Sequence, residues 1–303
     1  MALTLHDANF SYYPRRSKRG LMLSKNFVLL ISVLLVASLG TGVPNALADS
    51  SAGCTPPNCP WQPHTPGLRP SQPHVRLARP HAGQEESLNW GGYVVSAAAG
   101  SVSDVKGSWE VPSIACSRST EYAAFWTGID GFSDNTVEQT GILAECYRSH
   151  VYYYSWYEFY PSLPVYVTGQ VPVKAGDVVY AEVSYASSTF VATITDQTTG
   201  ATFSISQTDS SAQRSSAEWI AEAPSSGMGV LPLADFGVGY YGSDYTGITL
   251  TSYATVNGVT GAVSSFGSSV YELVMVTMNL TVKAQPSVLT SDGSSFSVTW
   301  KHS

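Results

Sequence analysis

The chain has 303 residues, of which 12% are charged and 44% hydrophobic, and its abundance of Tyr, Ser, Thr and Gly favours strands and turns over surface helices. From residue 87 onward seven Lys and Arg side chains stand against eighteen Asp and Glu, whereas residues 1–86 carry eight against four. Such an acidic body repels nucleic acid, which argues against a nucleic-acid partner, and its few basic groups predict tolerance of low pH.

Residues 1–48 are typical of an export signal. Lys25 precedes an apolar run over residues 27–39, and residues 46–48 supply the small-x-small cleavage pattern. The run is too short to predict a membrane span. Because basic residues lie further upstream, either the positively charged region is unusually long or translation begins at Met22. We expect a secreted protein that works in an acidic extracellular medium without stable membrane association.

Residues 49–88 form a Pro-rich, basic segment that contains Arg69, Arg76 and Arg79 and shows little apolar periodicity. This composition predicts an extended segment rather than a core. Two interpretations remain open. The segment is either a linker, or a propeptide whose positive charge lets it lie across the acidic domain as an intramolecular inhibitor.

The four cysteines divide between two parts of the chain. Cys54 and Cys59 lie in the Pro-rich segment, and Cys116 and Cys146 lie in the following domain. In an exported chain this distribution is compatible with two local disulfides. Neither pair has the neighbouring ligands that a zinc site needs, so no metal is expected.

The pattern over residues 89–303 predicts one all-β domain with almost no helix, because short β-like runs alternate with turn residues throughout. Alternation is clearest over residues 177–185, where Val179, Ala181 and Val183 share one face. Residues 174–177 and 197–200 predict hairpin connections. The expected architecture is an antiparallel β-sandwich of two sheets. The expected strands cover residues 91–97, 108–111, 122–127, 151–160, 165–173, 177–185, 190–195, 201–206, 217–221, 247–254 and 272–282.

Most common hydrolase designs are excluded by missing residues. A Ser-His-Asp or Cys-His enzyme needs a positioned imidazole, and the domain offers only His150 and the near-terminal His302. The sequence lacks the Gly-x-Ser-x-Gly and His-Glu-x-x-His motifs, phosphate loops and dinucleotide fingerprints. Asp130-Gly131 and Asp292-Gly293 do not match the paired loops of aspartic peptidases. Carboxylate chemistry without an imidazole is what remains.

Six sequence blocks occur in order along the domain. They are Asn89-Trp90-Gly91-Gly92-Tyr93, Gly107-Ser108-Trp109-Glu110-Val111-Pro112, Trp126-Thr127-Gly128-Ile129-Asp130-Gly131, Glu138-Gln139-Thr140-Gly141, Trp156-Tyr157-Glu158-Phe159-Tyr160-Pro161 and Ala217-Glu218-Trp219-Ile220. In this order the blocks resemble the eqolisins, also called glutamic peptidases. The resemblance runs from about Asn89 to the C-terminus, and the order of the blocks makes it specific although each block alone is weak.

The resemblance implies a concanavalin-like sandwich of two curved antiparallel sheets, with a Gln/Glu pair on the concave face and no cofactor. The pair falls on Gln139 and Glu218. One position departs from the family pattern, since Leu143 stands where an acidic residue is expected, four positions after the glutamine. Substrate-binding or supporting roles fall on Trp126, Asp130, Trp156, Glu158 and Trp219.

The chemistry of this pair is consistent with peptide hydrolysis in acid. A carboxylate with a pKa of about 4 is partly ionised in mild acid, so Glu218 can accept a proton from water and later return it to the leaving amine. The neutral amide of Gln139 can donate to the developing oxyanion at any pH. We therefore expect an acid endopeptidase that acts on polypeptides as a monomer.

Two other functions remain open. A carbohydrate-binding sandwich would use the same aromatic residues to stack on sugars, and a glycoside hydrolase would use Glu158 and Glu218 as its two carboxylates. The residues also have simpler interpretations, because a strand glutamate is usually solvated and Trp126, Trp156 and Trp219 would by default pack in a core. Trp90 and Trp109 are expected in the core.

Overall fold

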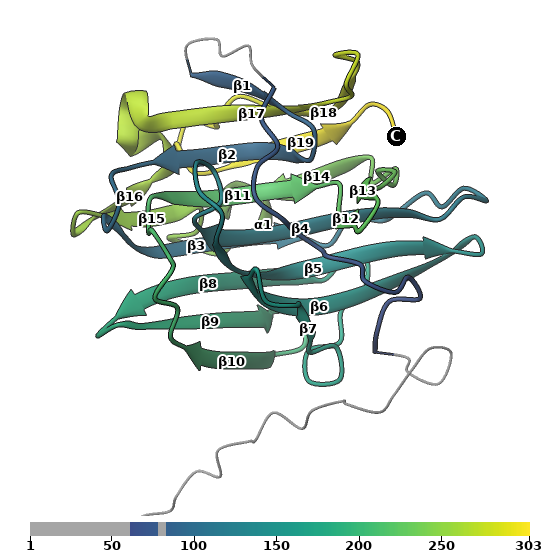
Figure 1. Cartoon of the computed structure of the whole chain (residues 1–303), viewed down its shortest axis with the longest axis horizontal. Helices are drawn as coiled ribbons and strands as arrows, with labels where there is room; N and C mark the ends of the chain where they lie inside the picture. The colour runs from purple at the N-terminus through teal and green to yellow at the C-terminus, as the bar shows by residue number, and fades with distance from the viewer. Residues whose placement is uncertain (1–60, 78–82) are drawn as a thin grey trace, which may run out of the picture. The chain divides into compact units, whose positions relative to one another are not determined.

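The computed structural model describes residues 61–77 and 83–303, so the predicted signal and the Cys54–Cys59 pair lie outside the described residues. The described domain is built of two layers of strands, and every strand pairing is antiparallel except that of β1 with β17 (Figure 1). An all-β sandwich with almost no helix is thereby confirmed. Within the described residues no helix is long and apolar enough to cross a membrane.

The first layer carries most of the predicted site residues. In order of pairing it contains β1 (Gln84–Ser87), β17 (Val270–Val276), β2 (Trp90–Ser96), β11 (Ser216–Glu222), β4 (Glu121–Ile129), β5 (Val137–Tyr147), β6 (His150–Tyr160) and β7 (Val165–Tyr166).

The second layer packs behind the first and joins it where β18 pairs with β17. It contains β10 (Ala201–Gln207), β9 (Thr189–Asp196), β8 (Val178–Ala186), β3 (Val102–Glu110), β15 (Tyr253–Val256) with β16 (Val259–Ala262), and β14 (Val238–Tyr241), β19 (Phe296–Trp300) and β18 (Val282–Pro286). The remaining elements are the short hairpin β12 (Ser225–Ser226) and β13 (Gly229–Val230), the helix α1 (Ser243–Thr246) and the 3-10 helix η1 (Val263–Ser269).

Two apolar clusters lie on opposite faces of the first layer. The larger cluster lies between the layers and includes Trp109, Phe125 and Trp219. The smaller lies on what we call the outer face, which carries Trp90 and Trp126. Trp109 is in the core as expected, whereas Trp90 is equally buried but on the outer face.

Some expected strands differ from those observed. The hairpin at residues 197–200 is confirmed, because β9 and β10 pair on either side of it. Residues 174–177 do form a turn, with Asp177 N–H donating to the Lys174 carbonyl, but they join no hairpin because strand β7 ends at Tyr166. The expected strand over residues 247–254 is also wrong, since only its end belongs to β15.

Candidate active site

Three polar side chains lie in one row across the outer face. Glu218 of β11 pairs with Gly128 of β4, Gly128 pairs with Gln139 of β5, and Gln139 pairs with Glu158 of β6. Directly opposed residues of antiparallel strands point to the same face. The fold therefore aligns Glu218, Gln139 and Glu158, from strands far apart in sequence, with a glycine between the first two.

Gly128 keeps the space between Glu218 and Gln139 open. A Cβ at this position would lie 2.8 Å from the Gln139 Cβ and 3.2 Å from Cζ3 of Trp126. The first distance is shorter than a normal carbon contact of about 3.5 Å, so a side chain here would displace Gln139. A glycine is therefore required at position 128, between the two predicted catalytic residues.

Gln139 is held by Glu158, which in turn contacts the N-terminal segment. The Gln139 Nε2 donates to Glu158 Oε2 at 3.1 Å, and Arg69 Nη1 donates to Glu158 Oε1 at 3.2 Å. Burial raises the pKa of Glu158 to about 8, although Arg69 and the hydrogen bond from Gln139 both lower it. The side-chain amide oxygen of Gln139, Oε1, is buried without a partner among the described residues.

Glu218 is fully buried, and neither of its carboxyl oxygens has a hydrogen-bond partner in the described part of the chain. Burial raises its pKa well above the ordinary value although the adjacent Ser216 side chain lowers it, and the neighbouring carboxyls of Asp130, Asp134 and Glu138 raise it further. A buried carboxyl without a partner is costly when charged, so burial favours the protonated form of Glu218. Buried polar atoms without partners are rare in proteins and often mark functional positions.

Asp130 positions the start of the strand that carries Glu218. It adopts a left-handed backbone conformation, with φ of 74°, and its carboxylate accepts the backbone N–H groups of Arg214 and Ser215, each at 2.6 Å. Asp134 accepts the Ser215 hydroxyl at 2.6 Å. Burial raises the pKa of Asp130 to about 6 against the hydrogen bond from Ser215, and Asp134 raises it further. These contacts fix the two residues that precede β11.

The predicted tryptophans lie on two different faces. Trp126 and Trp156 pair with Gly141 on either side of it and are fully buried on the outer face, next to the row. Trp219 lies on the opposite face, in the core between the layers, where its Nε1 donates to the Lys106 carbonyl at 2.7 Å. The structure thus brings Trp126 and Trp156 to the site and places Trp219 behind it.

Glu222 belongs to the outer face and was missed by sequence reasoning. It accepts Trp126 Nε1 at 2.9 Å, Asn89 Nδ2 at 3.0 Å and the Gln72 backbone N–H at 3.2 Å. Burial raises its pKa well above the ordinary value despite these donors. The alternation of a strand could have identified it, because a residue four positions after Glu218 points to the same face. Leu143, the departure from the family pattern, packs in the same outer cluster.

Residues 69–72 lie against this part of the outer face. Arg69 and Ser225 exchange backbone hydrogen bonds, and beyond the Arg69–Glu158 contact the Gln72 carbonyl accepts Trp90 Nε1 at 3.0 Å. Ser71 is fully buried. In Figure 1 this dark-blue segment runs across the strands of the first layer. The N-terminal segment therefore joins the Glu158 end of the outer face to Glu222.

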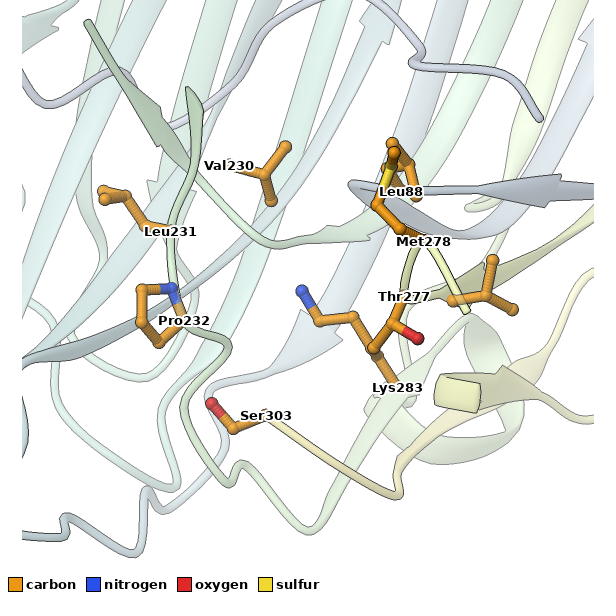
Figure 2. Close-up of a pocket in the computed structure, with 9 residues that line it drawn as sticks. Leu88, Val230, Leu231, Pro232, Thr277, Met278, Lys283 and Ser303 are labelled. Atoms are coloured by element: carbon orange, nitrogen blue, oxygen red, sulfur yellow. The ribbon is translucent and has the colours of Figure 1, made fainter. Parts of the chain in front are cut away.

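Two surface cavities flank the domain. One of about 530 Å³ lies beside the start of β5, lined by residues 133–136, Pro161, Ser211 and Gln213. The other, of about 370 Å³, surrounds Lys283 (Figure 2). In residues 61–77 and 83–303 no group of three or more His, Cys, Asp or Glu side chains is arranged to hold a metal ion.

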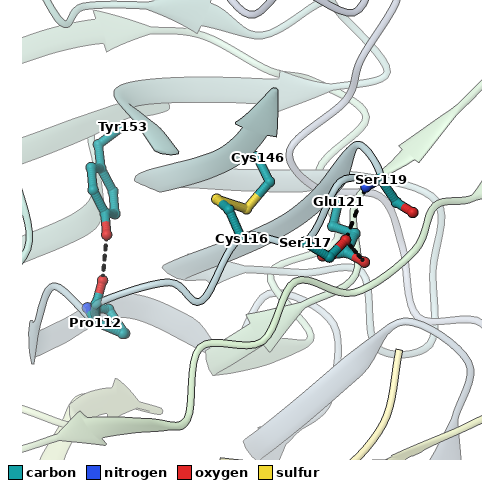
Figure 3. Close-up of a disulfide and its surroundings, with 7 residues drawn as sticks. All are labelled: Pro112, Cys116, Ser117, Ser119, Glu121, Cys146 and Tyr153. Atoms are coloured by element: carbon teal, nitrogen blue, oxygen red, sulfur yellow. Dashed lines mark hydrogen bonds between the residues drawn. A yellow bond between two sulfur atoms is a disulfide. The ribbon is translucent and has the colours of Figure 1, made fainter. Parts of the chain in front are cut away.

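A disulfide fixes the far end of the strand that carries Gln139. Cys116 and Cys146 are bonded, with Cα atoms 5.4 Å apart, which joins the loop after β3 to the end of β5 (Figure 3). Nearby, the Tyr153 hydroxyl of β6 donates to the Pro112 carbonyl at 2.7 Å. The expected disulfide within the domain is confirmed.

Three comparisons relate the chain to known proteins. The sequence model of the Peptidase A4 family matches residues 88–298. Aspergillopepsin-2 from Aspergillus niger is 32% identical over 180 residues, which make up 51% of this chain and 62% of that protein. The chain thus spans less than two thirds of this relative's length.

Solved structures show the same fold. Scytalido-glutamic peptidase, solved with a transition state analog inhibitor, matches with a TM-score of 0.57 and 22% identity, over 70% of this chain and 98% of its own. SCP-B, described as a member of the Eqolisin family of peptidases and solved with the tripeptide Ala-Ile-His, matches with a TM-score of 0.53 and 23% identity, over 70% and 98%. The expected eqolisin sandwich is thereby confirmed.

Proposed function

The chain belongs to the Peptidase A4 family, and on that basis we propose that it is a glutamic-type acid endopeptidase that hydrolyses polypeptides with Glu218 and Gln139. The observation that carries this proposal is the row on the outer face. It has Glu218 and Gln139 on either side of Gly128, both fully buried and both with oxygens that lack a partner among the described residues.

In the proposed mechanism Glu218 acts as general base and then as general acid. Substrate and water enter the row, and contact with water returns the pKa of Glu218 towards its ordinary value of about 4, so the carboxylate can take a proton from the attacking water. The carbonyl carbon becomes tetrahedral and its oxygen gains negative charge. Glu218 then gives the proton to the leaving amine, and the C–N bond breaks.

Gln139 stabilises the oxyanion in this mechanism, and Glu158 holds Gln139 in place. One N–H of the Gln139 amide is engaged by Glu158, which leaves the other for the substrate oxygen. Because the pKa of Glu158 is about 8, this group is protonated in acid. No negative charge of Glu158 then opposes the developing oxyanion, so the Gln139 amide stabilises the oxyanion fully.

We further propose that residues 49–88 are a propeptide that inhibits the enzyme after export directed by residues 1–48. Support comes from the contacts of residues 69–72, which occupy the outer face between Glu158 and Glu222. A substrate that reaches Gln139 would displace the Arg69 contact with Glu158. N-terminal sequencing of the secreted, acid-treated protein tests both boundaries, and a mature chain that retains Arg69 would contradict the inhibitory role.

Hydrolysis of denatured casein at about pH 3–4 tests the mechanism. We expect Glu218→Gln and Gln139→Ala each to lower turnover at least a hundredfold, the effect typical of losing one oxyanion donor or the general base. The controls are Glu110→Gln and Gln170→Ala, which remove the same groups at exposed positions.

Unchanged thermal unfolding of the two site variants would show that they remain folded. Casein hydrolysis that survives Gln139→Ala would contradict the proposed dyad. Cleavage of a polysaccharide that needs Glu158 but not Gln139 would instead support the glycoside hydrolase. Sugar binding without any hydrolysis would support a carbohydrate-binding sandwich.

A further inference from the structure

The cavity around Lys283 contains one buried cation. Its volume is about 370 Å³, within the range of roughly 300–1,000 Å³ that is usual for small-ligand sites. Val230, Leu231, Pro232 and Val276 form apolar walls, and Lys283 and Thr277 supply polar groups. None of the residues that line the cavity belongs to the Glu218–Gln139–Glu158 row.

Lys283 is fixed in this cavity by its backbone. It belongs to β18, and its carbonyl accepts the N–H groups of Lys301 at 2.7 Å and His302 at 3.1 Å. Its side chain is almost completely buried, with a relative exposure of 6%. Figure 2 shows the Lys283 nitrogen directed into the cavity, towards Pro232. Among the described residues no hydrogen bond or ion pair of this nitrogen is found.

A buried ammonium group without a counter-ion is energetically costly. Burial alone lowers the pKa of Lys283 to about 8, and no nearby charge offsets this effect. Below that pH the cation predominates, so an anion in the cavity would satisfy it. Lys283 has the one titratable side chain among the lining residues, and no ion pair joins it to the chain end at Ser303, which also lines the cavity.

Thr277 offers a second polar contact in the same cavity. Its hydroxyl oxygen accepts the Thr281 backbone N–H at 3.1 Å, so the hydroxyl proton remains available to a ligand. An ammonium and a hydroxyl donor within apolar walls together match a ligand with one anionic acceptor group and a hydrocarbon body. A polyanion such as a nucleotide would leave most of its charge unpaired against these walls.

We propose that this cavity binds a small apolar carboxylate, with the carboxylate on Lys283 Nζ and the Thr277 hydroxyl and the hydrocarbon against Val230, Leu231 and Val276. The ligand is a fatty acid or the apolar carboxyl terminus of a short peptide. Binding does not depend on the proposed peptidase activity, since the two sites share no residue.

Isothermal titration of the full-length chain at about pH 6 tests this site, because there a carboxylic acid is ionised while Lys283 is charged. The probes are octanoate, N-acetylleucine and, as the uncharged counterpart, octanol. We expect saturable binding of an acid and weaker binding of octanol. Tighter binding of octanoate assigns the site to fatty acids, whereas tighter binding of N-acetylleucine assigns it to peptide termini.

Lys283→Met should weaken binding of the acid by roughly tenfold to a hundredfold, the usual effect of losing a charged hydrogen bond, and leave octanol unaffected. The control is Lys174→Met, whose side chain is 74% exposed. Leu231→Trp, which fills the cavity, should abolish binding of all three probes, while thermal unfolding and casein hydrolysis report that both variants are folded. The proposal is overturned if neither acid binds, or if Lys283→Met binds the acid as tightly as the wild type.

Discussion

The two faces of β11 are equally buried but differ in how their polar atoms are satisfied. On the core face, Trp219 donates its only polar hydrogen to the Lys106 carbonyl. On the outer face, both oxygens of Glu218 lack partners among the described residues. Trp219 on the core face of β11 thus completes its interactions within the fold, whereas Glu218 on the outer face keeps oxygens that an entering molecule can satisfy. The strand shows how one element can serve stability on one side and chemistry on the other.

Removing a tryptophan from each face should separate stability from activity. Trp219→Ala leaves a large void between the layers and should lower the free energy of unfolding by about 3–5 kcal/mol, while the folded fraction keeps most of its activity. Trp156→Ala, matched in size and burial on the outer face, should lower casein hydrolysis more. Chemical denaturation measures the stability of each variant, and kinetics corrected for the folded fraction measure its activity. Equal loss of activity in the two variants would contradict the separation of stability from activity between the two faces.

Filling the gap in the row should affect activity more than stability. Gly128→Ala places a carbon 2.8 Å from the Gln139 Cβ, and a displacement of this size should lower kcat about a hundredfold, equivalent to about 2.7 kcal/mol. Gly169→Ala, where an added Cβ meets nothing within 4 Å, is the control. Activity of Gly128→Ala within a few-fold of wild type would show that the spacing of Gln139 is not critical.

The buried carboxyl of Glu158 should make stability fall as pH rises. Its folded pKa of about 8 lies above the ordinary value of 4.5, so between these values the folded chain binds more protons than the unfolded chain. The contribution of Glu158 to stability is therefore full below about pH 4.5 and declines towards pH 8. Glu158→Gln, which keeps an acceptor for Gln139, should make this dependence less steep, measured by denaturation at several pH values, while the buried Glu218 and Glu222 carboxyls still contribute in the same direction. An unchanged slope would place the titrating group elsewhere.

The smallest expected effect concerns His74, which helps to hold the N-terminal segment. Its ring stacks between Trp90 and Phe132, and neither nitrogen has a side-chain partner among the described residues. Burial lowers its pKa to about 4 and Arg76 lowers it further, whereas the Phe132 backbone carbonyl, as a hydrogen-bond acceptor for the ring, raises it. Because the free ring has a pKa of about 6.5, acidification through this range should weaken docking of the segment.

His74→Phe keeps the stacking without the charge, so residues 61–77 should resist proteolysis in acid longer than in the wild type. Limited proteolysis between about pH 3 and 7 measures this, with the exposed His302→Phe as the control. Equal acid sensitivity of His74→Phe and wild type would assign release of the segment to the carboxyls that bind Arg69 and Gln72.

Strand β8 was predicted from the sequence pattern because one of its faces is less buried than the other. Residues 178–183 alternate between partly exposed and buried positions in β8, as their alternation indicates. Strand β5, which carries Gln139, was not predicted as a strand, because nearly all of its residues are buried and no period of two is visible. Its Gln-Thr-Gly block was found only through the family resemblance. Glu222 was not identified because it lies just after the block Ala217-Glu218-Trp219-Ile220.

The sequence by itself determined the fold class, the family and the identity of the Gln139 and Glu218 candidates, since composition, strand-like runs and six ordered blocks are local properties of the chain. Only the tertiary structure decided that Glu218, Gly128, Gln139 and Glu158 form one row, and that Arg69 contacts that row. Neighbouring strands and their register are set by packing between segments far apart in sequence, and a shift of one residue would turn each of these side chains to the other face.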